Sequence, residues 1–212
     1  HVTAYRNLCR HLGIDPEPVV FADVIQQAVV PGPDLIERLG IDARGLFPGT
    51  SSNGGFAAEA VEPPAAGEPA REHTDEWGLV QRIEGGGHWW SLVAHPLDGM
   101  TLDPAAVDAH AWPDPEDPRR FAGLRQAAQA LRDAGYPVVC KGLCAGLFEM
   151  AQRLRGMENC LCDLLAEPAT ADRILDKVLD LKKRFWAAAL AEAGDLIDVV
   201  MEADDYGTQQ SQ

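Results

Sequence analysis

The chain has 212 residues, of which 46% are hydrophobic, and it carries a formal net charge of −15. This length suits one sizeable domain. Because nucleic-acid-binding proteins usually present a basic surface, the acidic charge argues against a nucleic-acid partner. No apolar run reaches the length of about 18 residues that a membrane-spanning helix needs, so no membrane segment is expected.

The number of cysteines indicates a reducing compartment. There are five, an odd number. In a chain of this length that favours reduced thiols in a cytoplasm over a disulfide framework. Their spacings, C-x₃-C at 140–144 and C-x-C at 160–162, do not match a strong zinc pattern. We therefore expect a cytoplasmic protein whose cysteines hold no metal.

The first elements are predicted as helices and a short strand. Residues 1–14 predict a helix that ends at Gly13, and a second helix is expected over about 21–29. Residues 34–49 predict a helix, a glycine cap at Gly40 and a short strand.

The middle of the chain is rich in turn-forming residues. Residues 48–72 contain many Gly, Pro, Ala and Glu residues and predict a long surface loop. Residues 78–97 predict two strands around the sequence EGGG, which is typical of a hairpin. Together, residues 48–97 are expected to form an insertion within the domain. A helix is then expected over roughly 118–134, with Pro118 near its start.

The last third alternates between strands and helices. Strands are predicted over 136–142 and 195–205. Between them, a helix over 144–156 shows apolar residues at helical spacing, and further apolar segments follow at 161–167 and 170–194. A strand, a long helical crossover and a second strand form a β-α-β unit, which predicts parallel pairing of the two strands.

The two predicted strands of this unit end in charged residues. In parallel α/β folds, functional residues collect at the carboxyl ends of the strands. Asp204 and Asp205 follow the second strand, and Lys141 lies at the end of the first. These residues are therefore expected at the rim of an active site.

Several stretches, spread over nearly the whole chain, resemble one family. They are AYRNLCRHLGI, LIERLGIDARGL, HTDEWG, HPL, WPDPEDPRRFAGL, GLFEMAQRLRGMENCLCDLL and ADDYGTQ. In this order they are similar to the uroporphyrinogen decarboxylase superfamily. The nearest likeness is to the branch that includes corrinoid-dependent methyltransferases and O-demethylases.

This resemblance implies an α/β fold of the TIM-type (β/α)₈ barrel, with its site at the carboxyl end. A complete barrel takes about 250 residues. Only three or four barrel strands are recognisable, so residues 1–212 are expected to form a single partial barrel domain, the N-terminal part of the fold. A partial barrel leaves a sheet edge uncovered, so we expect a homo-oligomer or a completing chain.

The acidic pair is the main catalytic candidate. Two close carboxylates repel one another, so one of the pKa values of Asp204 and Asp205 is expected to rise, giving an acid and a base at one site. In a demethylase, the acid would protonate the departing alkoxide or phenoxide. In a decarboxylase, an Asp would hold the pyrrole N–H groups. The alternative is a solvated strand end that caps a helix.

Further candidates would bind substrate. Lys141 could bind a carboxylate, and Gln209 could form hydrogen bonds with a ligand. Each candidate also has a purely structural alternative, as a surface or packing residue. The full set of expected substrate-binding residues is Lys141, Glu149, Tyr206, Gln209 and Trp77.

No metal site is predicted within the chain. His73, Asp75 and Glu76 lie within four residues of one another and have the chemistry of metal ligands, but loop packing is the favoured interpretation. The resemblance implies a corrinoid on a partner protein. It allows zinc only with ligands outside this chain, and the decarboxylase alternative needs no cofactor.

Three functions remain open. The first is methyl transfer from a small methoxy substrate to a corrinoid. The second is decarboxylation of uroporphyrinogen III, although Gln152 stands where the decarboxylase has a helix Tyr. The third is a catalytically silent fragment that acts as an assembly module.

Overall fold

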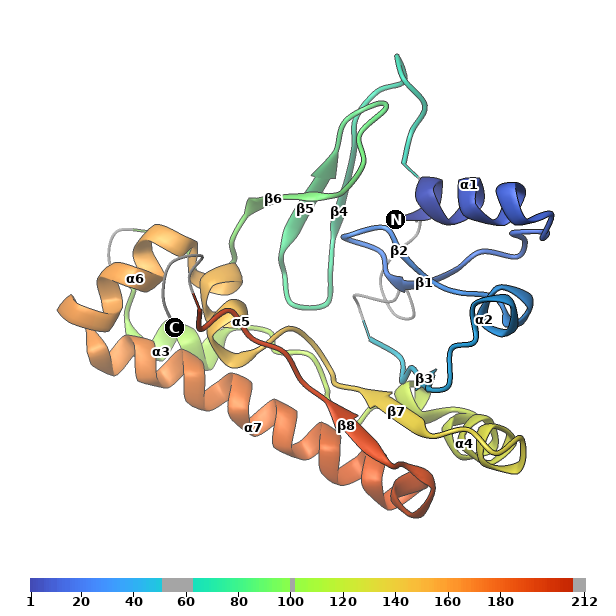
Figure 1. The fold of residues 1–212 in the computed structure, drawn as a ribbon. Coiled ribbons are helices and arrows are strands. Elements are labelled where there is room, and N and C mark those ends of the chain that lie inside the picture. The colour runs from blue at the N-terminus through green and yellow to red at the C-terminus, as the bar shows by residue number, and fades with distance from the viewer. Residues whose placement is uncertain (51–62, 100–101, 208–212) are drawn as a thin grey trace.

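The computed structural model describes residues 1–50, 63–99 and 102–207 (Figure 1). It is a mixed α/β structure with one parallel sheet and two antiparallel sheets. The strands are β1 (Val20–Asp23), β2 (Ala28–Val30), β3 (Arg44–Leu46), β4 (Arg71–Thr74), β5 (Val80–Ile83), β6 (Ser91–Ala94), β7 (Val138–Lys141) and β8 (Val199–Met201). The α-helices are α1 (Val2–Leu12), α2 (Pro33–Leu39), α3 (Pro104–Ala109), α4 (Leu124–Asp133), α5 (Leu147–Arg155), α6 (Met157–Ala166) and α7 (Pro168–Ala193).

The N-terminal region confirms two predictions and corrects one. Helix α1 ends at Gly13 and α2 at Gly40, both in the left-handed conformation, and β3 follows α2 as expected. The helix expected over 21–29 is wrong, because β1 and β2 form an antiparallel hairpin there. The β-branched pairs at 19–20 and 29–30 favour extended backbone, and Gln27 turns the chain with a φ of 54°.

The hairpin expected over 78–97 is present, but it belongs to a larger sheet. Strands β5 and β6 flank the EGGG turn, and β4 adds a third antiparallel strand. Strand β4 begins within the segment predicted as a loop over 48–72 and extends beyond it to Thr74, and residues 51–62 of that segment lie outside the described part of the chain. Its polar sequence, REHT, carries no strand signal, so pairing with β5 determines its structure.

The helix expected over 118–134 is divided. A 3₁₀ helix covers Pro118–Phe121, and α4 begins only at Leu124. Gly123 separates them with a φ of 75°, which lies outside the helical region. The sequence prediction also missed α3, which begins after Asp103, whose side chain caps it.

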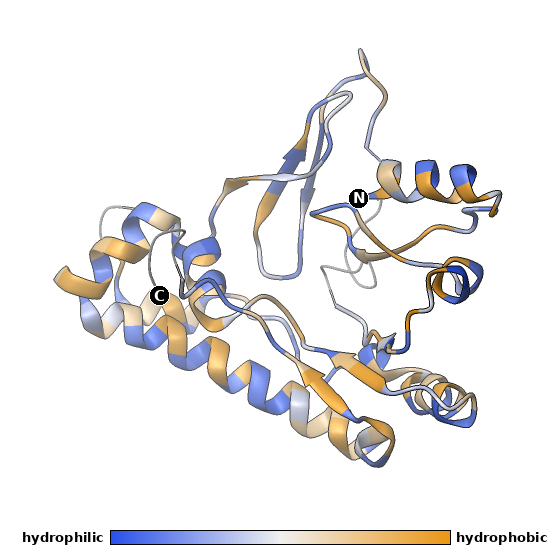
Figure 2. Cartoon of the chain, viewed as in Figure 1, coloured by the Kyte–Doolittle hydropathy of each residue, from blue (hydrophilic) through white to orange (hydrophobic). Residues whose placement is uncertain are grey.

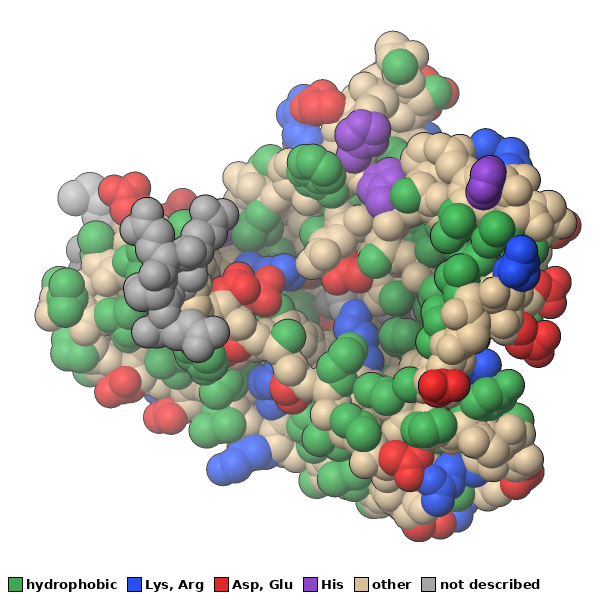
Figure 3. All heavy atoms as spheres, viewed as in Figure 1, with side chains coloured by type: hydrophobic (Ala, Val, Ile, Leu, Met, Phe, Trp, Pro, Cys, Tyr) green, Lys and Arg blue, Asp and Glu red, His purple; other side chains and the backbone are tan. Residues whose placement is uncertain are grey.

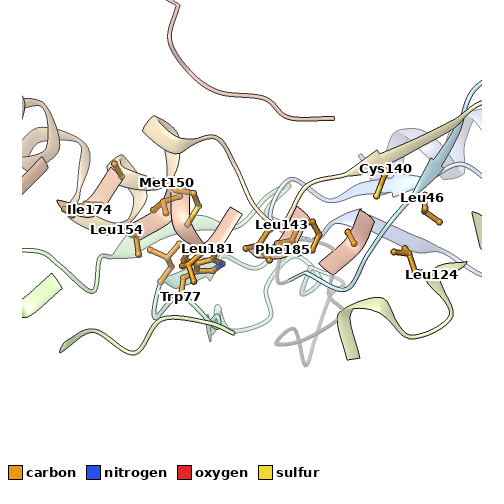
Figure 4. Close-up of a cluster of buried hydrophobic side chains, with 14 of the residues drawn as sticks. Leu46, Trp77, Leu124, Cys140, Leu143, Met150, Leu154, Ile174, Leu181 and Phe185 are labelled. Atoms are coloured by element: carbon orange, nitrogen blue, oxygen red, sulfur yellow. The ribbon is translucent and has the colours of Figure 1, made fainter. Parts of the chain in front are cut away.

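The parallel sheet follows the order β3-β7-β8, and the β7–β8 pairing confirms the predicted parallel unit. Helices α5, α6 and α7 form the crossover between β7 and β8 (Figure 1). The main hydrophobic core joins sheet side chains such as Leu46 and Cys140 to helix side chains such as Phe185 (Figure 4).

The outer edge of the sheet is uncovered among the described residues. The side chains of β8 keep about half of their surface exposed, 51% for Val199, 51% for Val200 and 46% for Met201. Figure 2 shows this strand as hydrophobic. The described residues do not form a closed barrel, and none of their helices is both long and apolar enough to cross a membrane.

Candidate active site at the carboxyl end of the parallel sheet

Strands β7 and β8 bring the predicted residues to one edge. Lys141 is paired in register with Met201, and the Gly142 amide donates to the Met201 carbonyl at 3.2 Å. After β8 the chain runs over the start of α5. A Cβ atom on Gly142 would lie 2.6 Å from Oε1 of Glu202, so a side chain at this position would displace the end of the Glu202 side chain.

Asp204 caps helix α5 from a distant part of the chain. The N-cap residue of α5 is Gly146, which has no side chain to accept the first amides of the helix. The carboxylate of Asp204 accepts them instead, from the amide nitrogens of Phe148 at 3.0 Å and Glu149 at 2.9 Å. A Cβ atom on Gly146 would lie only 2.0 Å from Cγ of Asp204, so the carboxylate occupies the place of the missing side chain.

These contacts correct the expected role of Asp204. Partial burial raises its pKa, but hydrogen bonds from the Glu149 and Phe148 amides and from the Tyr206 hydroxyl lower it more, so the pKa lies below its ordinary value. Asp204 is therefore held as a carboxylate, and it is not the member of the acidic pair whose pKa rises. The Asp205 amide donates to Asp204 Oδ1 at 2.9 Å, while the Asp205 side chain is exposed.

Tyr206 lies beside this cap. Its ring stacks on Phe148 with a centroid distance of 6.1 Å and an interplanar angle of 10°. Its hydrogen bond to Asp204 raises the pKa of the phenol. The side chain is nevertheless 69% exposed, so a ligand at this edge can reach it.

Arg153 pairs with Glu149, and its charge also acts on Lys141. Nζ of Lys141 donates to the Ala22 carbonyl at 2.9 Å, which joins the end of β7 to hairpin β1–β2. Burial lowers the pKa of Lys141; the charge of Asp23 opposes this change and that of Arg153 reinforces it. Glu149 pairs with Arg153 at 2.5 Å. Figure 3 shows a hollow in this face of the molecule, with basic and acidic side chains inside it.

A second pair of charged residues, Lys182 of α7 and Glu202 after β8, lies at this edge of the parallel sheet. Lys182 is 7% exposed and pairs with Glu202 at 2.6 Å, and the indole of Trp186 donates to the same carboxylate at 2.6 Å. With Asp204 and Tyr206 these residues line a groove of about 610 Å³. Because Glu202 and Lys182 neutralise one another, the groove is suited to apolar rather than charged ligands.

Two residues of the HTDEWG stretch, Asp75 and Trp77, are buried in the protein. Trp77 is 1% exposed and packs edge-on against Trp112, so it offers almost no surface to a substrate. The Asp75 carboxylate accepts the Trp77 amide at 2.9 Å, and Glu76 pairs with the buried Arg120. Neighbouring acids therefore have separate structural partners. Within the described residues, no three His, Cys, Asp or Glu side chains converge on a possible metal position.

The sequence analysis missed some of the residues that complete the edge. Gln209 lies outside the described part of the chain. Arg153 and the Lys182–Glu202 pair were not predicted. Arg153 could have been found, because it follows Glu149 by four residues, a spacing that brings opposite charges together on a helix. The Lys182–Glu202 pair joins two different elements, so no local spacing indicates it.

Asp75 makes stability depend on pH. Burial raises its pKa to about 6, although the Leu79 and Trp77 amides lower it. A carboxyl group with a raised folded-state pKa contributes stability that is full below its unfolded pKa of about 3.9 and is lost as the pH rises through about 6. We expect the free energy of unfolding to fall by about 1–3 kcal/mol between pH 4 and pH 7.5 on this account.

The Asp75→Asn variant should lack this part of the pH dependence in urea unfolding, because an amide keeps the acceptor for the Trp77 and Leu79 amides without a charge. The Gln81 side-chain amide, which donates to Asp75 at 3.1 Å, would turn over in this variant so that its oxygen accepts from the introduced amide. Asp172→Asn, at an exposed position, is the matched control. An unchanged pH profile in Asp75→Asn would contradict this prediction.

No family model, curated protein or solved structure matches the chain. The fold and its edge residues define a mixed α/β protein with a charged cluster at the carboxyl ends of parallel strands. Function is therefore inferred from the chemistry of these residues and from the family resemblance of the sequence.

Proposed function

We propose that the chain is an enzyme similar to the corrinoid-dependent methyltransferases of the uroporphyrinogen decarboxylase superfamily. It would transfer a methyl group from a small methoxy substrate to a corrinoid carried by a partner protein. In this proposal, β3, β7 and β8 are neighbouring strands of a (β/α)₈ barrel. The proposal rests mainly on one observation. Lys141 and the segment Asp204–Tyr206 lie at the same edge of the sheet, at the carboxyl ends of the parallel strands β7 and β8.

The residues at this edge of the sheet would have separate roles in the reaction. Asp204 stays ionised and positions α5 and the backbone of Asp205. Asp205, with its exposed side chain, would relay a proton from a solvent water to the substrate oxygen as the methyl–oxygen bond breaks and the electron pair stays on oxygen. Tyr206 and Lys141 would orient the substrate by hydrogen bonding.

The corrinoid would supply the methyl acceptor. The exposed ring of Tyr206, beyond the carboxyl end of β8, leaves room for a partner protein to approach. Zinc, which the resemblance allows, would need ligands outside the described residues, and no step is assigned to it. A second copy or another chain is expected to cover the exposed strand β8.

The test supplies a methyl ether and a reduced corrinoid protein, and follows the methylated corrinoid by absorbance. A parallel reaction supplies uroporphyrinogen III and looks for coproporphyrinogen. Methyl transfer by the wild type and a fall of about 10²-fold in Asp205→Asn would support the proposal. Asp172→Asn, on the exposed face of α7, should keep full activity.

Three results would contradict the proposal or one of its parts. Formation of coproporphyrinogen without methyl transfer would favour the decarboxylase alternative. Absence of both reactions over a range of methyl ethers would favour the assembly module. Equal activity in Asp205→Asn and the wild type would remove Asp205 from the mechanism.

A further inference from the structure

A groove lies between helix α7 and the segment that follows β8 (Figure 1). Its volume of about 610 Å³ is in the range of small-molecule sites. One wall is a face of α7, on which Leu179, Lys183 and Trp186 follow one another at helical spacing. The opposite wall includes Tyr206 and, at the start of α5, Leu147. Leu179 and Trp186 are separated by about 10 Å along the helix axis, so the groove is long enough for an extended alkyl chain.

The aromatic walls of the groove are held in fixed orientations. The ring of Trp186 packs edge-on against Phe185 with a centroid distance of 5.5 Å, and its indole donates to Glu202 at 2.6 Å. Across the groove, the ring of Tyr206 is stacked on Phe148. These contacts do not involve a ligand, so the apolar surface is already formed in the free protein.

The buried charges in the groove already have partners. Nζ of Lys182 pairs with Glu202 at 2.6 Å and donates to the Ala145 carbonyl at 2.9 Å. It also lies 3.8 Å from Sγ of Cys144, so all three N–H groups of this ammonium are directed at protein atoms. The Glu202 carboxylate in turn accepts from both Lys182 and Trp186. These groups therefore have little capacity left to bind a charged ligand.

Lys183 is the exception among the charged residues of the groove. It is exposed, and among the described residues its ammonium group has no ion pair or side-chain hydrogen bond. The adjacent Arg184 pairs with Glu116 instead. On the opposite wall, the carboxylate of Asp204 is bound by backbone amides at the start of α5. The groove thus combines apolar walls with one available positive charge, which is complementary to a molecule with an apolar body and one anionic group.

We propose that this groove binds unbranched carboxylates of medium chain length. The alkyl chain lies between α7 and the segment after β8, and the carboxylate lies beside Lys183. Because the chain carries a net charge of −15, an anion gains nothing from the protein as a whole and depends on this local cation and on burial of its alkyl chain. The binding involves no reaction, so it does not depend on the methyl transfer proposed above.

Isothermal titration calorimetry of the full chain at neutral pH tests the proposal with three probes. Octanoate should bind at one saturable site. Hexanoate should bind several-fold more weakly, because it buries two fewer methylene groups. Octanamide has a similar alkyl chain but no charge, and it should also bind several-fold more weakly than octanoate because it forms no ion pair with Lys183.

Four variants locate the alkyl chain and the carboxylate. Leu179→Glu places a negative charge in the groove and should abolish octanoate binding, whereas Leu190→Glu, at an exposed position of α7 that does not line the groove, should not change it. Lys183→Gln should weaken octanoate binding several-fold and leave octanamide binding unchanged. Lys177→Gln is its control, because Lys177 lies near Asp108 and outside the groove. Circular dichroism would verify that all four variants are folded.

The proposal is overturned if the wild type shows no saturable binding of octanoate, or if Leu179→Glu and Leu190→Glu bind it equally well. Equal binding of octanoate and octanamide by the wild type, or by Lys183→Gln and Lys177→Gln an equal loss of octanoate binding, would overturn the role of Lys183. The methyl-transfer assay on the same wild-type preparation reports on the proposed function separately.

Discussion

Arg155→Met is expected to lower the free energy of unfolding by about 3–5 kcal/mol. The Arg155 side chain is 1% exposed and pairs with Asp163 at 2.7 Å. It also donates to the carbonyls of Leu97 at 2.9 Å and Gly99 at 2.6 Å, which attach the end of β6 and its following turn to α5. Methionine fills much of the volume but leaves a buried carboxylate and two carbonyls without donors.

Urea unfolding at neutral pH measures this effect. Arg173→Met is the matched control, because its pair with Asp108 is exposed and should contribute less than about 1 kcal/mol. The double variant Arg155→Met/Asp163→Leu should recover part of the loss, since an apolar pair removes the unpaired charge. A loss below about 1 kcal/mol in Arg155→Met would show that Arg155 does not hold these segments together.

Gly146→Ala should lower the free energy of unfolding by about 2–4 kcal/mol and abolish the proposed activity. A methyl group at this position would lie 2.0 Å from Cγ of Asp204, so the carboxylate must leave the end of α5. The variant then loses two charge-assisted hydrogen bonds, from the amides of Phe148 and Glu149, and releases the segment after β8. Urea unfolding and the methyl-transfer assay measure the two effects.

Gly194→Ala is the control for this substitution. Gly194 has helical dihedral angles, and its nearest contact would be 3.3 Å, so alanine should change stability by less than about 0.5 kcal/mol. The double variant Gly146→Ser/Asp204→Gly separates local capping of α5 from the contact with the segment after β8, because glycine at 204 also removes the Cβ atom that would lie 2.3 Å from a Cβ at position 146. Its serine should restore about 1 kcal/mol relative to Asp204→Gly by capping α5 locally, without restoring activity. No difference between these two variants would contradict the capping role of Asp204.

The elements with strong local signals were predictable from the sequence. Glycines after the helices at 1–14 and 34–39 mark their ends, and the long apolar crossover before 195 predicts the parallel pairing of β7 and β8. Errors occurred where tertiary contacts override local preference. Strand β4 has a polar sequence and depends on β5, and the short hairpin β1–β2 has too few residues for a clear period.

The candidate site was predictable in position but not in the role of its acids. The strand order places Asp204, Asp205 and Lys141 at one edge, as the β-α-β pattern predicts. The capping role of Asp204 depends on the absence of a side chain at Gly146, far earlier in the chain, and no local pattern indicates that contact. Trp77 was placed in the site because of its motif, whereas its burial assigns it to the core.

The pKa of Asp204 tests the arrangement of this edge most directly. A carbon-detected NMR titration of the carboxyl group, assigned with Asp204→Asn, should give a pKa below the ordinary value of about 3.9. Because this pKa is lowered on folding, the contribution of Asp204 to stability should be present above about pH 4 and disappear at lower pH. A pKa at or above the ordinary value would contradict the account, because Asp204 could not then be the ionised cap that joins β8 to α5.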